Sequence, residues 1–415
     1  MYKIVDFLHD FQAGFRRGRS TIDQIHCIRQ IIQKSDDKNT ETLHLLIDFK
    51  AAYDSVDREE LWSLMTEYKF PHKLIRLLRS TLQKVQSRVK VQGLLSESFE
   101  TVTGLKQGDE LSTKLFNIAL EGVCRRARLE LNGSIFNKST QLLAYADDID
   151  IIGRNLRSIT DAYTRLEREA EIIGLKVNEE KTKLLMVAAS HRTKQRVGSH
   201  LSIDGKSFEV VQEFKYLGSF INTLADVSME VRKRIHSAYG AFYSLKHLFT
   251  SKSLSRGTKI MLYKTLIRVI ALYGAETWNS TQADEDALGV LERRVLRAIY
   301  GPVKEGQEYR SRHNHELYLL FQDADIVTVL RANRLRWAGH VFRRPEDAPV
   351  HRVTTADFVD GKRSRGRPKN SWIGCVEKDA RVLNVPNWQK VSKDRTVFRQ
   401  SLRAAMGPRA PQPRK

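Results

Sequence analysis

Two adjacent aspartates, Asp147 and Asp148, stand between apolar, β-branched runs in the segment 141–153, QLLAYADDIDIIG. Apolar runs on both sides of a short polar turn predict a β-hairpin. Two like charges at such a turn repel each other, and burying them costs free energy unless a cation compensates. The stretch alone is explained by a divalent metal site or, equally well, by an ordinary aspartate-containing turn.

A third aspartate, Asp48, stands near the end of the apolar run 43–49, LHLLIDF, which predicts a strand. An aspartate at the end of a buried strand lies where ligands often gather. Three aspartates on neighbouring strands suggest two divalent ions, and Mg2+ prefers carboxylate and phosphate oxygens, with Mn2+ as an alternative ion. Two such ions activate a hydroxyl and stabilise a leaving pyrophosphate, which is chemistry used by polymerases and nucleases.

The composition favours a polyanionic partner for this chemistry. The chain has 415 residues, enough for two or three domains, and carries a formal net charge of +21 with a pI near 9.8. Residues 331–415 hold 21 Lys or Arg against 7 Asp or Glu, so +14 of the charge lies there. Nucleic acid is the usual partner of such a protein, and a generally basic protein is the alternative.

The three cysteines, at Cys27, Cys124 and Cys375, are far apart in the sequence. Their spacing excludes a zinc knuckle and a disulfide framework, and indicates an intracellular, reduced protein. No apolar run approaches membrane-spanning length, and the first 20 residues lack a secretory signal. We therefore expect no membrane partner, and the oligomeric state does not follow from the sequence.

Two glycine-flanked loops accompany the aspartates. Residues 14–21, GFRRGRST, carry Arg16 and Arg19 into a predicted helix N-terminus, which suggests a phosphate contact, although a solvated basic turn has the same pattern. Residues 104–108, GLKQG, precede a long amphipathic helix. The remaining patterns predict a hairpin over 85–102, helices over 71–83 and 156–173, a mostly helical region over 228–300, a polar connection over 302–315 and a helix over 316–341.

Six segments in order give the chain a family resemblance. They are QAGFRRGRSTIDQI, LIDFKAAYDSVDR, GLKQGDELSTKLFN, AYADDIDIIG, GLKVNEEKTK and FKYLGSFI, which together cover residues 12–222. In this order they resemble the reverse transcriptases of non-LTR (LINE-type) retrotransposons. The segments YGAETW, RLRWAGHV and KRSRGRPKNSW resemble the region C-terminal to the polymerase in such elements.

The resemblance implies roles for individual residues. Asp48, Asp147 and Asp148 match the metal-binding triad, and Tyr53 matches the aromatic steric gate that rejects a ribonucleotide 2′-hydroxyl. Gln107 matches a contact to the incoming nucleotide and template, and Lys181 matches a lysine that protonates pyrophosphate. Arg16 and Arg19 fall in a fingers segment and are expected to contact template or triphosphate. Taken singly, Tyr53 also fits core packing, Gln107 a loop hydrogen bond and Lys181 a solvated face.

The resemblance also implies a fold and an activity. We expect an α+β right-hand polymerase with a ferredoxin-like palm and partial fingers over 1–225, a helical thumb over 226–345, and a basic nucleic-acid-binding extension over 346–415 with a disordered tail. The implied activity is RNA-directed DNA polymerisation, using dNTPs, an RNA template and a DNA primer. A two-metal nuclease is the weaker alternative, since it needs neither a steric gate nor a nucleotide-binding loop.

Departures from the family pattern support a second interpretation. Glu110 and Thr113 stand where the family usually has prolines, which pre-order the loop. The chain begins just before QAGF, without the upstream fingers and endonuclease of the family, so we expect a fragment or decayed copy. The alternative function is therefore a catalytically inactive remnant that acts only as a basic nucleic-acid-binding protein.

A basic stretch near the C-terminus, RSRGRPKN, contains Arg363, Arg365, Arg367 and Lys369. It resembles an AT-hook, which lays arginines along a narrow minor groove, but a basic linker gripping phosphates without sequence preference is the favoured interpretation. The same cluster suggests nuclear localisation. Trp337 and Trp372 near these arginines are candidates for base stacking or, more simply, for helix packing.

Overall fold

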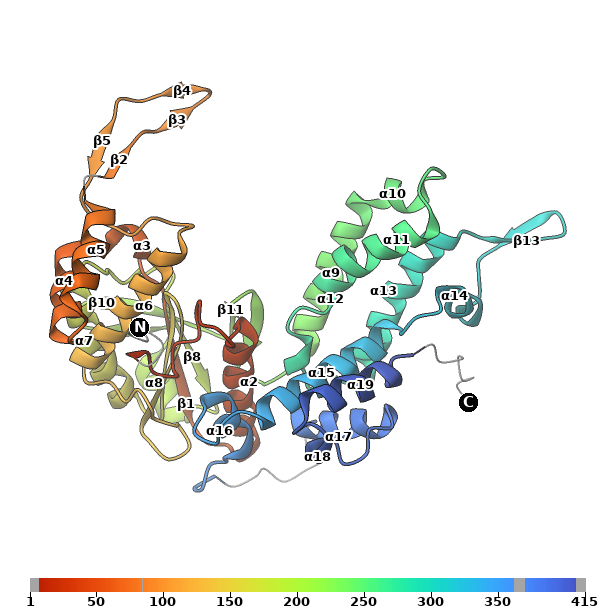
Figure 1. The fold of residues 1–415 in the computed structure, drawn as a ribbon. Coiled ribbons are helices and arrows are strands. Elements are labelled where there is room, and N and C mark those ends of the chain that lie inside the picture. Colours follow the sequence, from red (N-terminus) through yellow and green to blue (C-terminus); the bar gives the residue numbers. More distant parts are fainter. Residues whose placement is uncertain (1–6, 84, 362–369, 408–415) are drawn as a thin grey trace. The chain divides into compact units, whose positions relative to one another are not determined.

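A computed structural model describes residues 7–83, 85–361 and 370–407, which form two compact units, shown in Figure 1. The first unit contains described residues 7–217 and 355–361, and the second contains residues 218–354 and 370–407. The boundaries between these compact units lie at 217/218 and around the return of the chain at 355–361. Residues 363–369, with the basic stretch, and residues 408–415 of the tail lie outside the described residues.

The first unit is a mixed α and β structure whose elements follow the sequence predictions closely. Its helices are α2 (Thr21–Lys38), α3 (Ala52–Ser55), α4 (Arg58–Glu67), α5 (His72–Leu82), α6 (Glu110–Arg126), α7 (Leu156–Ile172) and α8 (His191–Val197). The strands of its main sheet are β1 (Thr42–Ile47), β6 (Thr140–Tyr145), β7 (Asp148–Gly153), β8 (Lys183–Val187), β9 (His200–Ile203) and β10 (Lys206–Val211), and β11 (Glu213–Tyr216) comes after them in the chain.

A six-stranded sheet in the order β6-β7-β1-β8-β10-β9 forms the frame of this unit. β1 is buried along its whole length and pairs antiparallel with both β7 and β8. The predicted hairpin at 141–153 is confirmed, because β6 and β7 pair antiparallel from Thr140 opposite Gly153 to Tyr145 opposite Asp148. Since a shift of one residue would move every side chain to the other face, this apolar pairing fixes where each strand ends.

Helices α4, α6 and α7 supply the apolar side of the core that packs with the sheet. The buried side chains of these helices include Leu64, Phe116 and Leu166, all of which are fully buried. Each helix begins at a side-chain N-cap, namely Asp57 for α4, Asp109 for α6 and Asn155 for α7. Such caps satisfy backbone N–H groups that would otherwise lack partners. The core thus holds the sheet edge that carries the aspartates.

A two-part β-arm projects from the first unit between α5 and α6 (Figure 1). The predicted hairpin over 85–102 is confirmed, since β2 (Val85–Ser87) pairs with β5 (Phe99–Thr101) and β3 (Lys90–Val91) pairs with β4 (Leu94–Leu95). The chain returns from this arm directly into the loop 104–108 that carries Gln107.

The second unit is mostly helical and has its own core. Its elements are β12 (Ser219–Asn222), α9 (Ser228–Ser244), α10 (Lys246–Thr250), α11 (Arg256–Leu262), a π-helical turn (Tyr263–Ile267), α12 (Arg268–Ala271), a 3₁₀ turn (Ala275–Thr277), α13 (Gln282–Tyr300), β13 (Val303–Glu305), β14 (Glu308–Arg310), α14 (Asn314–Phe321), α15 (Ile326–Phe342), α16 (Pro349–Thr355), α17 (Trp372–Val382), α18 (Trp388–Val391) and α19 (Arg395–Ala405). Helix α13 lies at the centre of its apolar cluster, with Leu288, Leu291 and Val295 fully buried.

Two sequence expectations in this unit are wrong. The helix predicted over 316–341 is two helices, α14 and α15, with residues 322–325 between them. Residues 302–315 were expected to be a polar connection, but β13 and β14 pair antiparallel there, with Glu305 opposite Glu308. Gly306 lies between the two strands with a φ of +64°, a conformation that glycine adopts at low cost. The sequence VKEGQEYR lacks a long apolar run, so the turn at Gly306 was the available signal.

Among the described residues, no helix is long and apolar enough to cross a membrane.

Candidate active site

The three aspartates that were predicted to bind metal lie together at one end of β1 and β7. Ile47 faces Ile149 across the antiparallel pair, so one further step along each strand places Asp48 opposite Asp148. Asp147 precedes Asp148 in the turn between β6 and β7. Carboxylates from two sequence segments about a hundred residues apart therefore meet at one sheet edge.

The electrostatics of this edge reflect the partial burial of the carboxylates and, after it, their mutual repulsion. Partial desolvation, with the charges of Asp147 and Asp48, raises the pKa of Asp148 to about 6. Desolvation and Asp48 also raise the pKa of Asp147, against the effect of a hydrogen bond from its own backbone N–H. The Oδ2 atom of Asp48 is buried without a hydrogen-bond donor among the described residues. The site thus holds more negative charge than its neighbours neutralise.

These carboxylates suit a divalent ion that is shared with a substrate. Within the ranges that the structure describes, no group of three or more His, Cys, Asp or Glu side chains is placed to enclose a metal by itself. Mg2+ is usually held by one or two carboxylates together with water and substrate phosphates. The Asp48 oxygen that lacks a hydrogen bond among the described residues and the raised pKa values of Asp147 and Asp148 fit that form of binding.

Lys181 brings a positive charge to the same edge. Its Nζ lies 3.9 Å from Oδ2 of Asp48, and its side chain is 70% exposed. The loop before β8 is fixed to the end of β1, because Asn178 N–H donates to the Asp48 carbonyl (2.7 Å) and Asp48 N–H donates to the Thr182 hydroxyl (3.2 Å). The exposed ammonium group is therefore held near the carboxylates while remaining accessible to a ligand.

Tyr53 stands beside the aspartates in α3. Its ring stacks on Phe116 of α6, with centroids 4.6 Å apart and an interplanar angle of 18°. Burial raises the pKa of Tyr53 to about 12, and the charge of Asp147 contributes to this rise. The phenol oxygen is buried without a hydrogen-bond partner among the described residues. The ring is thus fixed by packing, as a steric barrier requires, and its hydroxyl is not needed to hold it.

Gln107 lies in an exposed loop next to α3. Its side-chain amide donates to Oδ2 of Asp54 at 3.4 Å. The loop begins at Gly104, where φ is +82° and a Cβ would lie 2.7 Å from the Asp54 carbonyl oxygen, so only glycine allows this approach. The two segments are also joined where Leu105 N–H donates to the Tyr53 carbonyl (2.7 Å). Tyr53 and Gln107 are therefore positioned as one assembly.

The two residues that replace family prolines do not disrupt this loop. Glu110 is the first residue of α6, after the Asp109 N-cap, and an acidic residue is favoured at a helix N-terminus. Its carboxylate pairs with Lys114 at 2.7 Å, which compensates the added charge. Thr113 donates its hydroxyl to the Glu110 carbonyl at 2.8 Å. The helix thus begins in an ordered way without proline.

Arg16 and Arg19 are engaged within their own segment. Arg16 donates to the carbonyls of Leu8, His9 and Gln12, at 3.1, 2.6 and 2.9 Å. Arg19 pairs with Asp10 at 2.5 Å. Both guanidinium groups therefore stabilise the N-terminal segment, and their contact with template or triphosphate stays a prediction.

Gln12 is a positioning residue that the sequence predictions missed. Its side-chain oxygen accepts hydrogen bonds from Ala146 N–H (2.8 Å) and Gly14 N–H (2.7 Å), and its amide donates to the Ala146 carbonyl (3.2 Å). Ala146 has a φ of +56°, so the turn before Asp147 adopts a conformation that costs free energy for a residue with a Cβ. One buried amide thus holds both polar groups of this strained residue.

Gly14 and Asn117 complete this contact. A Cβ at Gly14 would lie 2.3 Å from the Ala146 nitrogen, so the segment approaches the turn only because position 14 is glycine. The Asn117 side chain in α6 donates to the Gly14 carbonyl at 2.8 Å. The segment QAGF therefore holds the turn that carries Asp147. Its Gln and Gly were the residues in the sequence that could have indicated this role.

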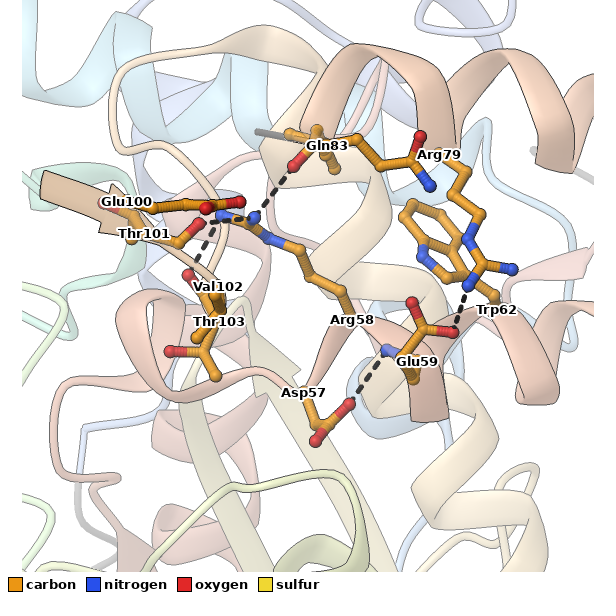
Figure 2. A pocket seen from close by; sticks show the side chains of 11 residues that line it. Asp57, Arg58, Glu59, Trp62, Arg79, Gln83, Glu100, Thr101, Val102 and Thr103 are labelled. Atoms are coloured by element: carbon orange, nitrogen blue, oxygen red, sulfur yellow. Dashed lines mark hydrogen bonds and ion pairs between the residues drawn. The ribbon is translucent and has the colours of Figure 1, made fainter. Parts of the chain in front are cut away.

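A cavity of about 370 Å³ lies at the base of the β-arm, and Figure 2 shows Arg58 at its centre. The Arg58 guanidinium donates to four backbone carbonyls, those of Leu82 (2.8 Å), Thr101 (2.9 Å), Thr103 (3.0 Å) and Gly104 (2.7 Å). Arg79 and Glu59 form an exposed ion pair in the same cavity, at 2.6 Å. Arg58 therefore ties both ends of the arm to α4 and fixes the start of the Gln107 loop.

The two tryptophans near the C-terminal arginines are packing residues. Trp372 is 1% exposed and donates its indole N–H to the Glu276 carbonyl at 2.8 Å. Trp337 is buried in α15 and stacks on His340, with centroids 4.9 Å apart. Neither ring offers a free face for a base. The predicted nucleic-acid-binding residues Arg363, Arg365, Arg367 and Lys369 lie outside the described residues.

The sheet with its edge of carboxylates, the stacked tyrosine and the glycine-bounded loop define the palm of a right-hand polymerase. The family model described as reverse transcriptase (RNA-dependent DNA polymerase) matches residues 1–221, more than half of the chain. The chain therefore belongs to the reverse transcriptase family, and the α+β right-hand polymerase fold expected from its motifs is confirmed.

Relatives named after mobile elements support the resemblance that the motifs indicate. A transposon-derived protein of Caenorhabditis elegans is 25% identical over 61% of this chain and 91% of its own length. An RNA-directed DNA polymerase from transposon BS of Drosophila melanogaster is 26% identical over 70% of this chain and 32% of its own length. The Pol polyprotein of retrotransposable element R2DM, also from Drosophila melanogaster, is 25% identical over 50% of this chain and 20% of its own. The chain thus spans a third or less of two of these relatives.

Replacing Gln12 with alanine should loosen the aspartate turn. The change leaves the Ala146 N–H and carbonyl and the Gly14 N–H without their partner, at a cost of about 1–3 kcal/mol per buried group. Hydrogen exchange measured by mass spectrometry should become faster in peptides covering 144–148. Gln195→Ala, an exposed position in α8, serves as the control. Unchanged exchange at 144–148 in Gln12→Ala would refute the positioning role.

Replacing Arg58 should free the base of the β-arm. Arg58→Ala removes all four carbonyl contacts, and Arg58→Lys keeps the charge but not the forked geometry. Both variants should show faster limited proteolysis within 82–104 than the unchanged chain. Arg79→Gln, which removes only an exposed pair in the same cavity, should leave proteolysis unchanged. Equal proteolysis of Arg58→Ala and Arg79→Gln would show that Arg58 does not hold the arm.

Proposed function

We propose that this chain is an RNA-directed DNA polymerase that extends a DNA primer on an RNA template. The observation that supports this most directly is the meeting of Asp48, Asp147 and Asp148 at one sheet edge, beside a tyrosine ring fixed against Phe116. Polymerisation that is selective for dNTPs uses both features, since carboxylates hold the ions and a ring excludes the ribonucleotide sugar. A nuclease needs only the first feature.

The proposed reaction joins a dNTP to the primer. The 3′-hydroxyl oxygen attacks the α-phosphorus, and a new P–O bond forms while the bond to the β-phosphate oxygen breaks. Pyrophosphate leaves, and the hydroxyl proton passes to water. Bound Mg2+ or Mn2+ ions, two in the arrangement proposed here, would favour the ionised hydroxyl and neutralise charge on the phosphates. Asp48, Asp147 and Asp148 are the residues that would hold them.

The remaining site residues have separate roles in this proposal. Lys181 donates a proton to the leaving pyrophosphate, which its exposed ammonium near Asp48 can reach. The Tyr53 ring excludes a 2′-hydroxyl, and Gln107 contacts the nucleotide and template from its exposed loop. Arg16 and Arg19 are proposed to contact template or triphosphate from the N-terminal segment that they stabilise.

The subdomain roles follow from the same proposal. Residues 1–225 would act as palm and partial fingers, 226–345 as a helical thumb, and 346–415 as a basic nucleic-acid-binding extension. The net charge of +14 over residues 331–415 supports the last role. Binding through Arg363, Arg365, Arg367 and Lys369, and nuclear localisation through the same cluster, stay predictions from the sequence.

Primer extension tests the proposed polymerase. With an annealed RNA template and DNA primer, dNTPs and Mg2+, the chain should extend the primer. Asp147→Asn should lower the rate by about 100-fold or more, because one carboxylate charge that holds the ions is lost. Asp161→Asn, which removes an exposed carboxylate from α7, should retain the rate. Salt-sensitive RNA binding by the unchanged chain without any extension would favour the binding-only alternative.

The steric gate is tested by sugar selection. Tyr53→Ala should lower the ratio of kcat/KM for a dNTP over the matching ribonucleotide by about tenfold or more, because the ring that excludes the 2′-hydroxyl is removed. Tyr53→Phe is the matched control and should keep the ratio, since the phenol oxygen has no hydrogen-bond partner in the described part of the chain. An unchanged ratio in Tyr53→Ala would refute the gate.

A further inference from the structure

A row of three arginines lies along α19 in the second unit. Arg395, Arg399 and Arg403 are four residues apart, so they follow one face of the helix with a rise of about 6 Å between neighbours. All three are exposed, and none has an ion pair with an acidic residue in the described part of the chain. Like charges at this spacing destabilise a helix, so folding alone gives no reason for the row.

The acidic residue nearest in sequence does not neutralise this row. Asp394 is the N-cap of α19, and its carboxylate accepts the N–H groups of Thr396 (2.8 Å) and Val397 (3.1 Å). Residues 388–407 hold five Lys or Arg and one Asp. The positive charge of the helix therefore remains uncompensated within its own segment.

Helix α15 brings two further arginines to the row, as the adjacent positions of α15 and α19 in Figure 1 illustrate. Phe398 of α19 packs on Gly339, where a Cβ would lie 2.5 Å from the ring, so the helices approach closely. Desolvation and then the charges of Arg399 and Arg403 lower the pKa of Arg336. Desolvation and then Arg395 likewise lower the pKa of Arg343. The five guanidinium groups thus form one cluster, the α15–α19 arginine face.

Few groups oppose this charge. Glu276 is the acid that acts on Arg336, and desolvation raises the pKa of Glu276 itself. Arg336 otherwise donates to the Asn333 side chain (2.8 Å), and Arg343 donates to the Ser392 carbonyl (2.7 Å). A face with five guanidinium groups and one opposing carboxyl suits a ligand that carries several negative charges in a line.

The surface chemistry narrows the class of ligand. Phe398 and Leu402, the large apolar residues on the inner side of α19, are buried, so they are not available to enter a membrane. Guanidinium groups bind phosphate oxygens with two parallel hydrogen bonds. We propose that the α15–α19 arginine face of the second unit binds the phosphate backbone of a nucleic acid without reading its sequence, which rests on the nucleic-acid-binding role proposed above for residues 346–415.

The test compares the salt dependence of nucleic-acid binding between the unchanged 415-residue chain and its variants. The row variant is R395Q/R399Q/R403Q, and R192Q/K194Q/R196Q removes equal charge from exposed positions of α8. Binding of fluorescent single-stranded RNA, single-stranded DNA and duplex DNA is measured by anisotropy from 50 to 300 mM NaCl, without dNTPs. Circular dichroism checks folding, which the row variant should retain because its change relieves repulsion.

We expect the row variant to lose affinity by about tenfold or more and its slope of log Kobs against log salt to become shallower by about 2 to 3, as for three lost phosphate contacts. The α8 control should keep the slope of the unchanged chain. R395K/R399K/R403K should keep the slope and lose less affinity. The three nucleic acids distinguish an RNA backbone from a DNA backbone as the ligand.

An unchanged slope in the row variant, or an equal loss in the α8 control, would overturn the proposal. Binding to anionic phospholipid vesicles that depends on the row, with nucleic-acid binding unchanged, would also overturn it. The binding measurement does not depend on catalysis. Asp147→Asn should therefore keep the slope of log Kobs against log salt that the unchanged chain shows. The binding assay contains no dNTPs and measures no extension, so failure of the polymerase and failure of this face give different results.

Discussion

Repulsion among three carboxylates is the constraint around which the first unit is organised. Asp48, Asp147 and Asp148 gather because the antiparallel register of β1 and β7 places them at one edge, and this register is fixed by buried apolar side chains. Partial burial and the neighbouring carboxylates raise the pKa values of Asp147 and Asp148. Lys181, at 3.9 Å from Asp48, offsets only part of this negative charge. Free energy from the apolar core thus holds charges in an arrangement that a metal-bound substrate would relieve.

Such an arrangement needs support next to the turn itself. The Gln12 amide provides it by pairing with both backbone groups of Ala146, whose positive φ turns the chain into Asp147. Gln24 adds a hydrogen bond to the Ala144 carbonyl at 2.9 Å, and Asn117 holds Gly14 from α6. These amides are buried and uncharged, so they fix the turn without adding charge to the site. The N-terminal segment and α6 therefore contribute to the geometry of aspartates that are far from them in sequence.

The sequence predicted the elements whose pattern is local. Short apolar runs predicted β1 and the β6–β7 hairpin, and with them the placement of the aspartates on neighbouring strands. The role of Gln12 was not predictable in this way, since its partner lies 134 residues away and a lone glutamine has no periodic signature. The hairpin of β13 and β14 was missed because its strands are short and polar. The arginines of α19 have a helical spacing, but the density of basic residues at 363–369 led to the prediction of nucleic-acid binding there instead.

Helix α15 shows why arginine alone does not identify a binding surface. On its inner side Arg334 is 1% exposed and donates to Asp379 (2.9 Å) and Ser280 (2.7 Å), while Arg331 pairs with Glu285 (2.5 Å). A buried guanidinium is tolerated only with such partners, so these residues fix the helix in its unit. On its outer side Arg336 and Arg343 lack acidic partners at pairing distance in the described chain and face the arginines of α19. The inner arginines pair with acidic residues of their own unit, whereas the outer ones have no such pairing among the described residues. This difference points to an external polyanion as the partner of the outer arginines.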